Sequence, residues 1–175
     1  MRKTLQIIIF FLILLFPIEK KLLANDIYFV DYSKVMNESI AGKKAQSSLK
    51  KLLTDSNKKF NDTAKKLKEE ENKIISQKNA LTKEEYKKKA DALRKKVFDL
   101  NKQREKSIKD VARKRKKAGD EMLKNLNPIL GKYMQENNIS VVIDKKNVLM
   151  GDKKFEITSQ IIEILNKEFK SINLN

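Results

Sequence analysis

The sequence predicts an α+β fold that is mostly α, in which a long antiparallel helical hairpin projects from a small β-strand body. Two long stretches carry an apolar residue at every third or fourth position, as one face of a helix does. Short runs of β-forming residues flank these stretches on both sides. Helices of this length cannot be enclosed by the few remaining residues, so the hairpin must project.

The two apolar stripes define the helices of the hairpin, which we call the arm (residues 40–135). The first stripe consists of Leu49, Leu53, Phe60, Ala64, Leu67, Ile74 and Leu81. The second consists of Tyr86, Ala90, Leu93, Val97, Leu100, Arg104, Ile108, Val111, Arg115, Ala118, Met122, Leu126, Ile129 and Tyr133. Because only a short segment separates the stripes, the helices must run antiparallel and cover each other's apolar face.

A helix-start signal marks the tip of the arm, near residues 77–83. Thr82 and Glu85 have the spacing of a capping box, in which the hydroxyl accepts from the Glu85 amide and the carboxylate reaches back. The second arm helix should therefore begin at this point.

The segments on either side of the arm should form the body (residues 25–39 and 136–175). Residues 27–30, 139–143 and 148–150 are rich in β-forming residues and predict three short strands. Thr158 is suited to cap a final helix, and Asn127-Pro128 indicates a kink or a restart in the second arm helix.

The body is small for an independent core. Its two pieces hold about 55 residues, and the chain contains no cysteine that could supply a disulfide. Association of subunits through open strand edges is the expected remedy.

Residues 1–24 have the layout of a secretory signal peptide. Arg2 and Lys3 precede a mostly apolar run, and the small Ala24 is suited to cleavage before Asn25. The run covers about twelve residues, short of the ~20 needed to span a bilayer. An uncleaved short anchor is the alternative, and in either case we expect an exported chain.

Positive charge is concentrated on the arm. The whole chain has 40 Lys and Arg against 23 Asp and Glu, and residues 40–135 hold 29 basic and 13 acidic residues, a net charge of +16. The rest of the chain after residue 24 has a net charge of −2. A solvated helix surface needs charges of both signs, but a twofold excess of one sign favours binding to polyanions or acidic chains.

The composition argues against an enzyme, a metal site and a cofactor. The chain has no His and no Cys, which removes the commonest general base, the thiolate nucleophile and the usual zinc ligands. Its four glycines never cluster, so no phosphate-binding loop is present. Although residues 113–117 are all basic, on a helix they point in all directions, and Lys lacks the bidentate fork that reads bases, so no specific nucleic acid is expected.

The two ends of the chain carry more specific patterns. The first is Ile27-Tyr28-Phe29-Val30-Asp31, followed by Val35-Met36-Asn37-Glu38-Ser39 and Ala41-Gly42-Lys43. The second is Ile139-Ser140-Val141-Val142-Ile143-Asp144, followed by Asn147-Val148-Leu149 and Glu156-Ile157-Thr158. In these patterns and in the order of its elements, the chain resembles the Skp/OmpH-like periplasmic chaperone family.

This resemblance implies a homotrimer, with a small β-barrel body that trimerises and three helical arms around a cavity. It also implies an ATP-independent holdase of the periplasm. Such a chaperone binds unfolded outer-membrane β-barrel proteins, here called clients, and delivers them for outer-membrane assembly. Oligomerisation would involve residues of the end strands, namely Ile27, Phe29, Val141, Val142 and Ile143.

Client contacts are expected on the outer part of the arm. The cationic candidates are Lys65, Lys66, Lys68, Lys73, Lys78, Lys83, Lys87, Lys88, Lys89, Arg94 and Lys95. The apolar candidates are Ile75 and Phe98, which lie off the two stripes. Alternatively these two, like Ala112 and Leu123, widen the packing between the helices or contact the body.

Two other functions fit the same residues. One is an exported coiled-coil scaffold, or a protein that binds lipopolysaccharide or an anionic membrane surface without chaperone activity. The other is a nucleic-acid-condensing protein whose first residues only imitate a signal peptide.

Overall fold

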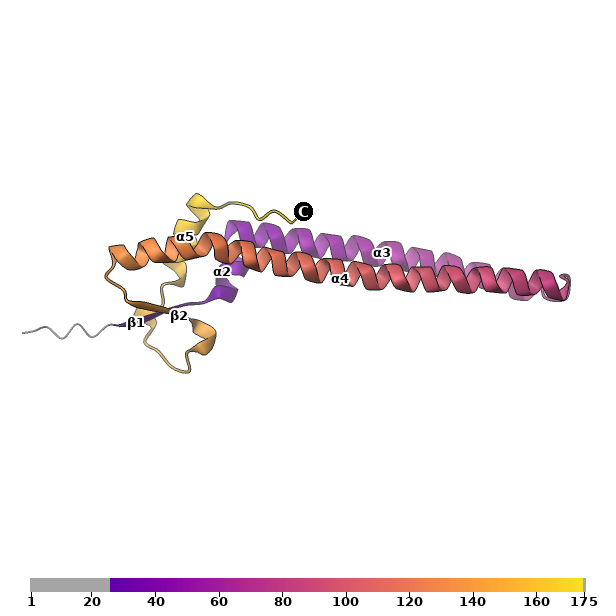
Figure 1. Ribbon diagram of the computed structural model, residues 1–175, viewed down its shortest axis with the longest axis horizontal. Coiled ribbons are helices and arrows are strands. Elements are labelled where there is room, and N and C mark those ends of the chain that lie inside the picture. Colours follow the sequence, from indigo (N-terminus) through magenta and orange to yellow (C-terminus); the bar gives the residue numbers. More distant parts are fainter. Residues whose placement is uncertain (1–25, 175) are drawn as a thin grey trace, which may run out of the picture.

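The computed structural model describes residues 26–174 of the chain. The elements follow in the order β1 (Ile27–Val30), α2 (Tyr32–Glu38), α3 (Ile40–Ser76), α4 (Lys83–Glu136), β2 (Val141–Asp144), η1 (Lys145–Asn147), η2 (Lys153–Phe155) and α5 (Thr158–Glu168). Figure 1 shows α3 and α4 side by side as a long rod that leaves one end of a small body. The predicted fold class is confirmed, whereas the predicted signal segment with Ala24 and Asn25 lies outside the described residues.

The arm consists of two long helices joined at a tight tip. With 37 residues in α3 and 54 in α4, they are roughly 55 and 80 Å long at 1.5 Å per residue. The predicted capping box is present: the Glu85 amide donates to the Thr82 hydroxyl over 3.2 Å, and the Thr82 amide donates to the Glu85 carboxylate over 2.9 Å. The turn that precedes α4 is therefore closed by its own side chains.

The longer helix, α4, does not restart at Pro128, as the sequence had allowed; it continues to Glu136. Its end is closed by Asn138, which has a positive φ of 54°, and by the Ile139 amide, which donates to the Met134 carbonyl over 2.9 Å. This bond satisfies one of the last helical carbonyls, and Asn stands in the left-handed position usually held by Gly. The chain turns back here and enters β2.

The sheet has two parallel strands, which the whole arm connects. β1 and β2 pair in register from Ile27 opposite Val141 to Val30 opposite Asp144. The other edge of β1 is covered, because Phe29 bridges to Glu156 and its carbonyl accepts from the Ile157 amide over 3.0 Å. Within the described residues, the outer edge of β2 has no partner strand.

The core lies where the base of the arm meets the body. Val35 of α2, Met122 and Leu126 of α4, and Ile161 and Leu165 of α5 are fully buried in one cluster. Ala41, in the first turn of α3, belongs to the same cluster. Residues of the arm therefore complete a core that residues 25–39 and 136–175 do not contain by themselves.

Two expectations for the closing segment are wrong. Residues 148–150 form no strand; Leu149 and Met150 are fully exposed in an irregular loop, because nothing pairs with this segment within the described residues. Thr158 does not cap α5, whose N-cap is Ile157 and has no side-chain cap bond. The Thr158 hydroxyl instead accepts from the Asp31 amide over 2.9 Å and donates to the Glu156 carboxylate over 3.1 Å. These two bonds link α5 to the start of α2.

The ion pair between Lys145 and Glu156 predicts that the stability of the fold depends on pH in the acidic range. Hydrogen bonds from Lys145, at 2.9 and 3.0 Å, hold the pKa of Glu156 below its usual value. A carboxylate with a lowered folded-state pKa stabilises the fold above its unfolded value of about 4.3 and loses that contribution as the pH falls through the folded value. Glu156→Gln should therefore lower stability at pH 7 and lower it less as the pH falls, in urea unfolding measured at pH 7 and at an acidic pH. Equal effects at both pH values would contradict this assignment.

Among residues 26–174, no helix combines the length and the apolar content needed to cross a membrane.

Candidate functional site

The contact between the two arm helices is buried at the base and unevenly covered further out, where Ile74 and Leu100 are buried but other stripe residues are not. Leu49, Val111 and Ala118 are buried, as the stripes predict, and Ala45 of α3 is buried beside them. By contrast, the stripe residues Leu53, Val97 and Ile108 are 39%, 42% and 64% exposed. The expectation that the partner helix covers these three side chains is wrong.

The reason is that a strict three-or-four count does not show which side chains the partner helix covers. In α3 the half-buried position is Leu52, which leaves Leu53 at the edge. In α4 the contact line passes through Leu100 and the half-buried Arg104, so Val97 and Ile108 lie beside it. A helix of 3.6 residues per turn drifts against a seven-residue repeat, and the covered face drifts with it.

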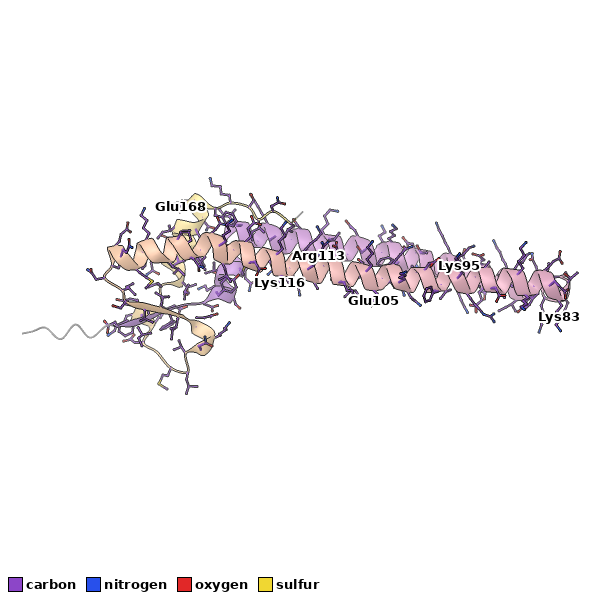
Figure 2. All side chains as sticks on the ribbon, viewed as in Figure 1. Lys83, Lys95, Glu105, Arg113, Lys116 and Glu168 are labelled. Atoms are coloured by element: carbon purple, nitrogen blue, oxygen red, sulfur yellow. The ribbon has the colours of Figure 1, made fainter. Side chains whose placement is uncertain are left out.

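The predicted cationic residues all lie on the exposed surface of the outer arm. Figure 2 shows side chains projecting around both helices along their whole length. Three of these residues have polar partners: Lys68 pairs with Glu71 at 2.7 Å, Arg94 with Asp91 at 2.7 Å, and Lys89 donates to Gln77 at 3.0 Å. Within residues 26–174 the following eight make no ion pair: Lys65, Lys66, Lys73, Lys78, Lys83, Lys87, Lys88 and Lys95.

Most acidic side chains of the arm, in contrast, are paired locally. Glu105 pairs with Lys109 and Asp110 with Arg113, and these hydrogen bonds hold the pKa of both carboxyls below their usual values. One pair joins the two helices: Lys96 donates to both oxygens of Glu70 over 2.6 and 2.8 Å. The positive excess therefore resides in lysines that face solvent. The exposed ion pairs of the arm contribute little to stability.

The apolar candidates Ile75 and Phe98 are 55% and 67% exposed. Ala112 is also exposed, and Leu123 is 42% exposed. Packing within the chain therefore leaves about two fifths or more of the surface of Ile75, Phe98 and Leu123 uncovered. They remain open to a partner.

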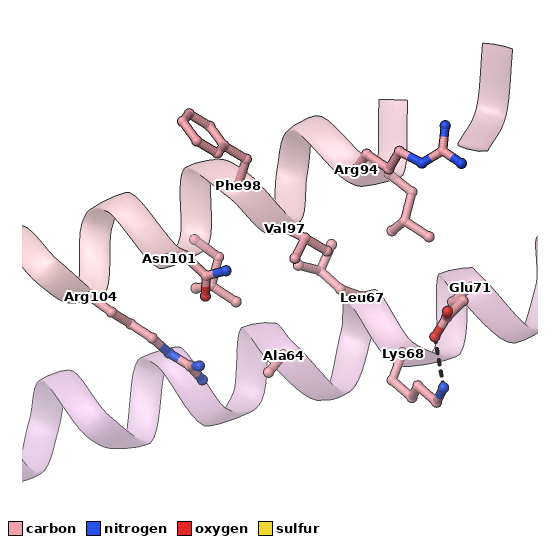
Figure 3. Close-up of a pocket in the computed structure, with 11 residues that line it drawn as sticks. Ala64, Leu67, Lys68, Glu71, Arg94, Val97, Phe98, Asn101 and Arg104 are labelled. Atoms are coloured by element: carbon pink, nitrogen blue, oxygen red, sulfur yellow. Dashed lines mark hydrogen bonds and ion pairs between the residues drawn. The ribbon is translucent and has the colours of Figure 1, made fainter. Parts of the chain in front are cut away.

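A groove between the helices adjoins Phe98 and was not predicted. It has a volume of about 600 Å³. Figure 3 shows Leu67 of α3 and Val97 of α4 facing each other inside it, with Arg104 reaching across between the helices. Two positions of the apolar stripes that line the groove hold a small or a polar residue, Ala64 in α3 and Arg104 in α4. A small or polar residue within an apolar stripe is the one signal that could have revealed it.

The strand residues expected to form the subunit interface differ in exposure. Ile27 and Val141 are 54% and 43% exposed, while Val142 and Ile143 are half-buried. Phe29 is 5% exposed and already packs inside its own chain. The open apolar surface of the sheet is thus made by Ile27 and Val141, near the free edge of β2.

Comparison with known proteins identifies the family that has this architecture. Residues 26–165 match the family described as outer membrane protein (OmpH-like). The chain belongs to the OmpH-like family. No curated protein matches its sequence.

A solved structure has the same fold as this OmpH-like chain. It is the 2.83 Å crystal structure of a protein from Caulobacter crescentus CB15 that is proposed to be an OmpH-like outer membrane chaperone. The two chains align with a TM-score of 0.78 over 84% of this chain and 87% of that one, at 18% sequence identity. At that identity the likeness establishes the fold.

Proposed function

We propose that this OmpH-like chain is an ATP-independent holdase chaperone of the periplasm. It binds unfolded outer-membrane β-barrel proteins in a cavity between cationic helical arms and delivers them for outer-membrane assembly. The observation that carries the proposal is the arm itself, which projects from the body with a net charge of +16 and with exposed apolar residues among its lysines. Family membership and the chaperone assignment of the Caulobacter crescentus protein support it.

The surface of the arm suits a partner that has no fixed shape. Solvent-facing lysines attract acidic segments over distances of about a Debye length, ~10 Å at 0.1 M salt. Side chains such as Phe98 and Ile75 offer apolar contact once a segment arrives. Each contact is weak, but several arms acting together raise the overall affinity through effective concentration, so no chemical step is needed for capture or release.

The proposal includes a homotrimer with residues 25–39 and 136–175 as its body and residues 40–135 as its arms. The exposed Ile27 and Val141, beside the unpartnered edge of β2, support an interface at the sheet. Edges of this kind pair readily with another chain. Three arms on such a body would enclose the client cavity.

Val141→Asp is expected to dissociate the trimer, because it would bury an unpaired carboxylate at the interface. Sizing by light scattering at micromolar concentration should show loss of the trimeric mass. Ser140→Asp places the same charge one residue earlier, outside β2, and should leave the mass unchanged. A wild-type chain that is already monomeric at this concentration would refute the trimer.

The proposal also includes removal of residues 1–24 during export. Amino-terminal sequencing of the periplasmic protein should begin at Asn25. An intact Met1 on a cytoplasmic protein would refute this step and would favour a nucleic-acid-condensing function.

Suppression of aggregation tests the activity. An outer-membrane β-barrel protein, unfolded in urea and diluted into buffer without ATP, should remain soluble when the mature chain is present in stoichiometric amounts. If the barrel protein aggregates as fast as it does alone, while the chain binds lipopolysaccharide vesicles, the chain is instead an envelope scaffold or lipopolysaccharide-binding protein.

A further inference from the structure

A second groove lies on the arm next to the first, and one arginine lines both. The second groove has a volume of about 250 Å³ and is lined by Leu53, Asn57, Phe60, Asn61, Arg104, Ser107 and Ile108. Arg104 also closes one end of the first groove (Figure 3). A guanidinium group therefore lies between the two grooves.

Both grooves open on the same face of the arm. Residues seven positions apart share a face of a helix. Asn57 of the second groove and Ala64 of the first are seven apart in α3, and Asn101 of the first and Ile108 of the second are seven apart in α4. A single extended segment that follows the arm can thus enter both grooves.

The lining of the grooves matches an extended peptide with a negative charge. One N–H of the half-buried Arg104 donates to the Phe60 carbonyl at a long 3.4 Å, and a guanidinium has further donors for a carboxylate. Four neutral polar side chains also line the grooves, and none of them has a hydrogen-bond partner within residues 26–174. They are Asn57, Asn61, Asn101 and Ser107. Such groups can bond to the amides and carbonyls of a segment that has no strand partner.

Glu71 is the only acidic residue that lines either groove within the described part of the chain. It lies at the far end of the first groove and is held by Lys68 at 2.7 Å (Figure 3). Its charge is therefore balanced by that lysine, and Arg104 is the charged group that the two grooves share.

We infer that the two grooves bind an extended client segment with two apolar residues four positions apart and a carboxylate midway between them. In an extended chain the residues i, i+2 and i+4 point to one side, and four residues span roughly 13 Å. Leu100 in the first groove and Ile108 in the second are eight helical residues apart, roughly 12 Å. The apolar residues enter the two grooves, and the carboxylate meets Arg104. This inference rests on the proposed holdase function and names the kind of segment that the arm holds.

Three short peptides test the spacing. Acetylated and amidated peptides would contain Leu-Ser-Asp-Ser-Leu, the same residues rearranged as Leu-Asp-Ser-Ser-Leu, or Leu-Ser-Asn-Ser-Leu, each between Gly-Ser ends. Their affinities would be read from methyl NMR signals of the mature chain labelled at Leu and Val. The first peptide should bind at least fivefold more tightly than the other two and should shift the signals of Leu67 and Val97. Equal affinities for all three would overturn the inference.

Variants with matched controls test the residues. Arg104→Gln should abolish the preference for Asp over Asn, whereas Lys102→Gln, which removes one charge from α4 outside the grooves, should retain it. Ala64→Leu fills the first groove and should weaken the first peptide at least fivefold, whereas Ala92→Leu, elsewhere on α4, should not. Circular dichroism would verify that all four variants are folded.

The outcomes separate this inference from the proposed function. If the wild-type chain prevents aggregation of a barrel protein but the peptides and variants show no preference, the grooves are only loosely packed parts of the arm and the inference fails alone. If the chain does not prevent aggregation either, the proposed function fails as well.

Discussion

Gly42→Ala is expected to lower the free energy of unfolding by about 3 kcal/mol, because it places a methyl group inside the junction of α2 and α3. A Cβ at this position would lie 2.1 Å from the Met36 carbonyl oxygen, 2.7 Å from its carbon and 2.9 Å from the Ser39 hydroxyl. Two of these atoms belong to the backbone and cannot rotate away. The Gly42 amide also donates to the Ser39 hydroxyl that caps α3, so a shift at this point disturbs the start of the arm.

Gly131→Ala is the matched control for this substitution. Gly131 also lies in a helix, but apart from its own neighbours and the surrounding helix backbone no atom lies within 4 Å of the position its Cβ would take. Ala is the better helix former, so this variant should be about 0.5–1 kcal/mol more stable than the wild type. Urea unfolding at equal protein concentrations would measure both, because assembly adds to the apparent stability. If Gly42→Ala were as harmless as Gly131→Ala, the close approach of α2 and α3 would be wrong.

Replacing six lysines of the outer arm by glutamine is expected to slow the association of acidic unfolded clients by roughly tenfold at low salt. The six residues are Lys65, Lys66, Lys68, Lys87, Lys88 and Lys89. Gln has nearly the helix propensity of Lys, so helix content and particle mass should not change. Stopped-flow association rates at low and moderate salt would show the effect and its loss as salt screens the field.

The chain offers a control with the same change in net charge. Six lysines follow residue 136, namely Lys145, Lys146, Lys153, Lys154, Lys167 and Lys170. Their replacement by glutamine should slow association much less, because they lie on the body rather than on the arm. If the double variant Phe98→Ala and Ile75→Ala slows client association more than the replacement of the six arm lysines does, apolar contact rather than charge recruits clients.

Much of the fold could be predicted because it depends on local patterns. The two helical stripes and the capping box at Thr82 and Glu85 predict both arm helices and the tip between them. β1 lies where the run at residues 27–30 predicts a strand, and β2 (141–144) begins two residues after the start of the run predicted at 139–143. Each of these signals acts over a few residues, where local propensity and capping decide the structure.

What could not be predicted depends on contacts between distant segments. Residues 148–150 have the same β propensity as β2. A segment forms a strand only when it pairs with another strand, and the described residues provide no partner for this one. Thr158 has the chemistry of a cap, yet the Asp31 amide, 127 positions earlier, takes its hydroxyl. Local sequence propensity does not include such contacts with distant residues.

The grooves escaped prediction for a related reason. The stripes show which face of each helix is apolar, but they do not show which residues of α3 and α4 lie next to each other and leave a groove. That arrangement depends on how the hairpin is registered, which positions Ala64 near Asn101 and places Arg104 between two grooves. The cationic surface, in contrast, follows from composition alone, because solvent-facing helix residues keep their charge wherever the partner helix lies.

Native mass spectrometry of the mature chain mixed with an unfolded outer-membrane β-barrel protein, without ATP, tests the central claim most directly. The account predicts a particle of three chains alone and, after mixing, a new particle of three chains with one barrel protein. It also predicts that raising the salt lowers the amount of the loaded particle. A mixture that contains only the empty chain, while the barrel protein is lost to aggregation, would contradict the account.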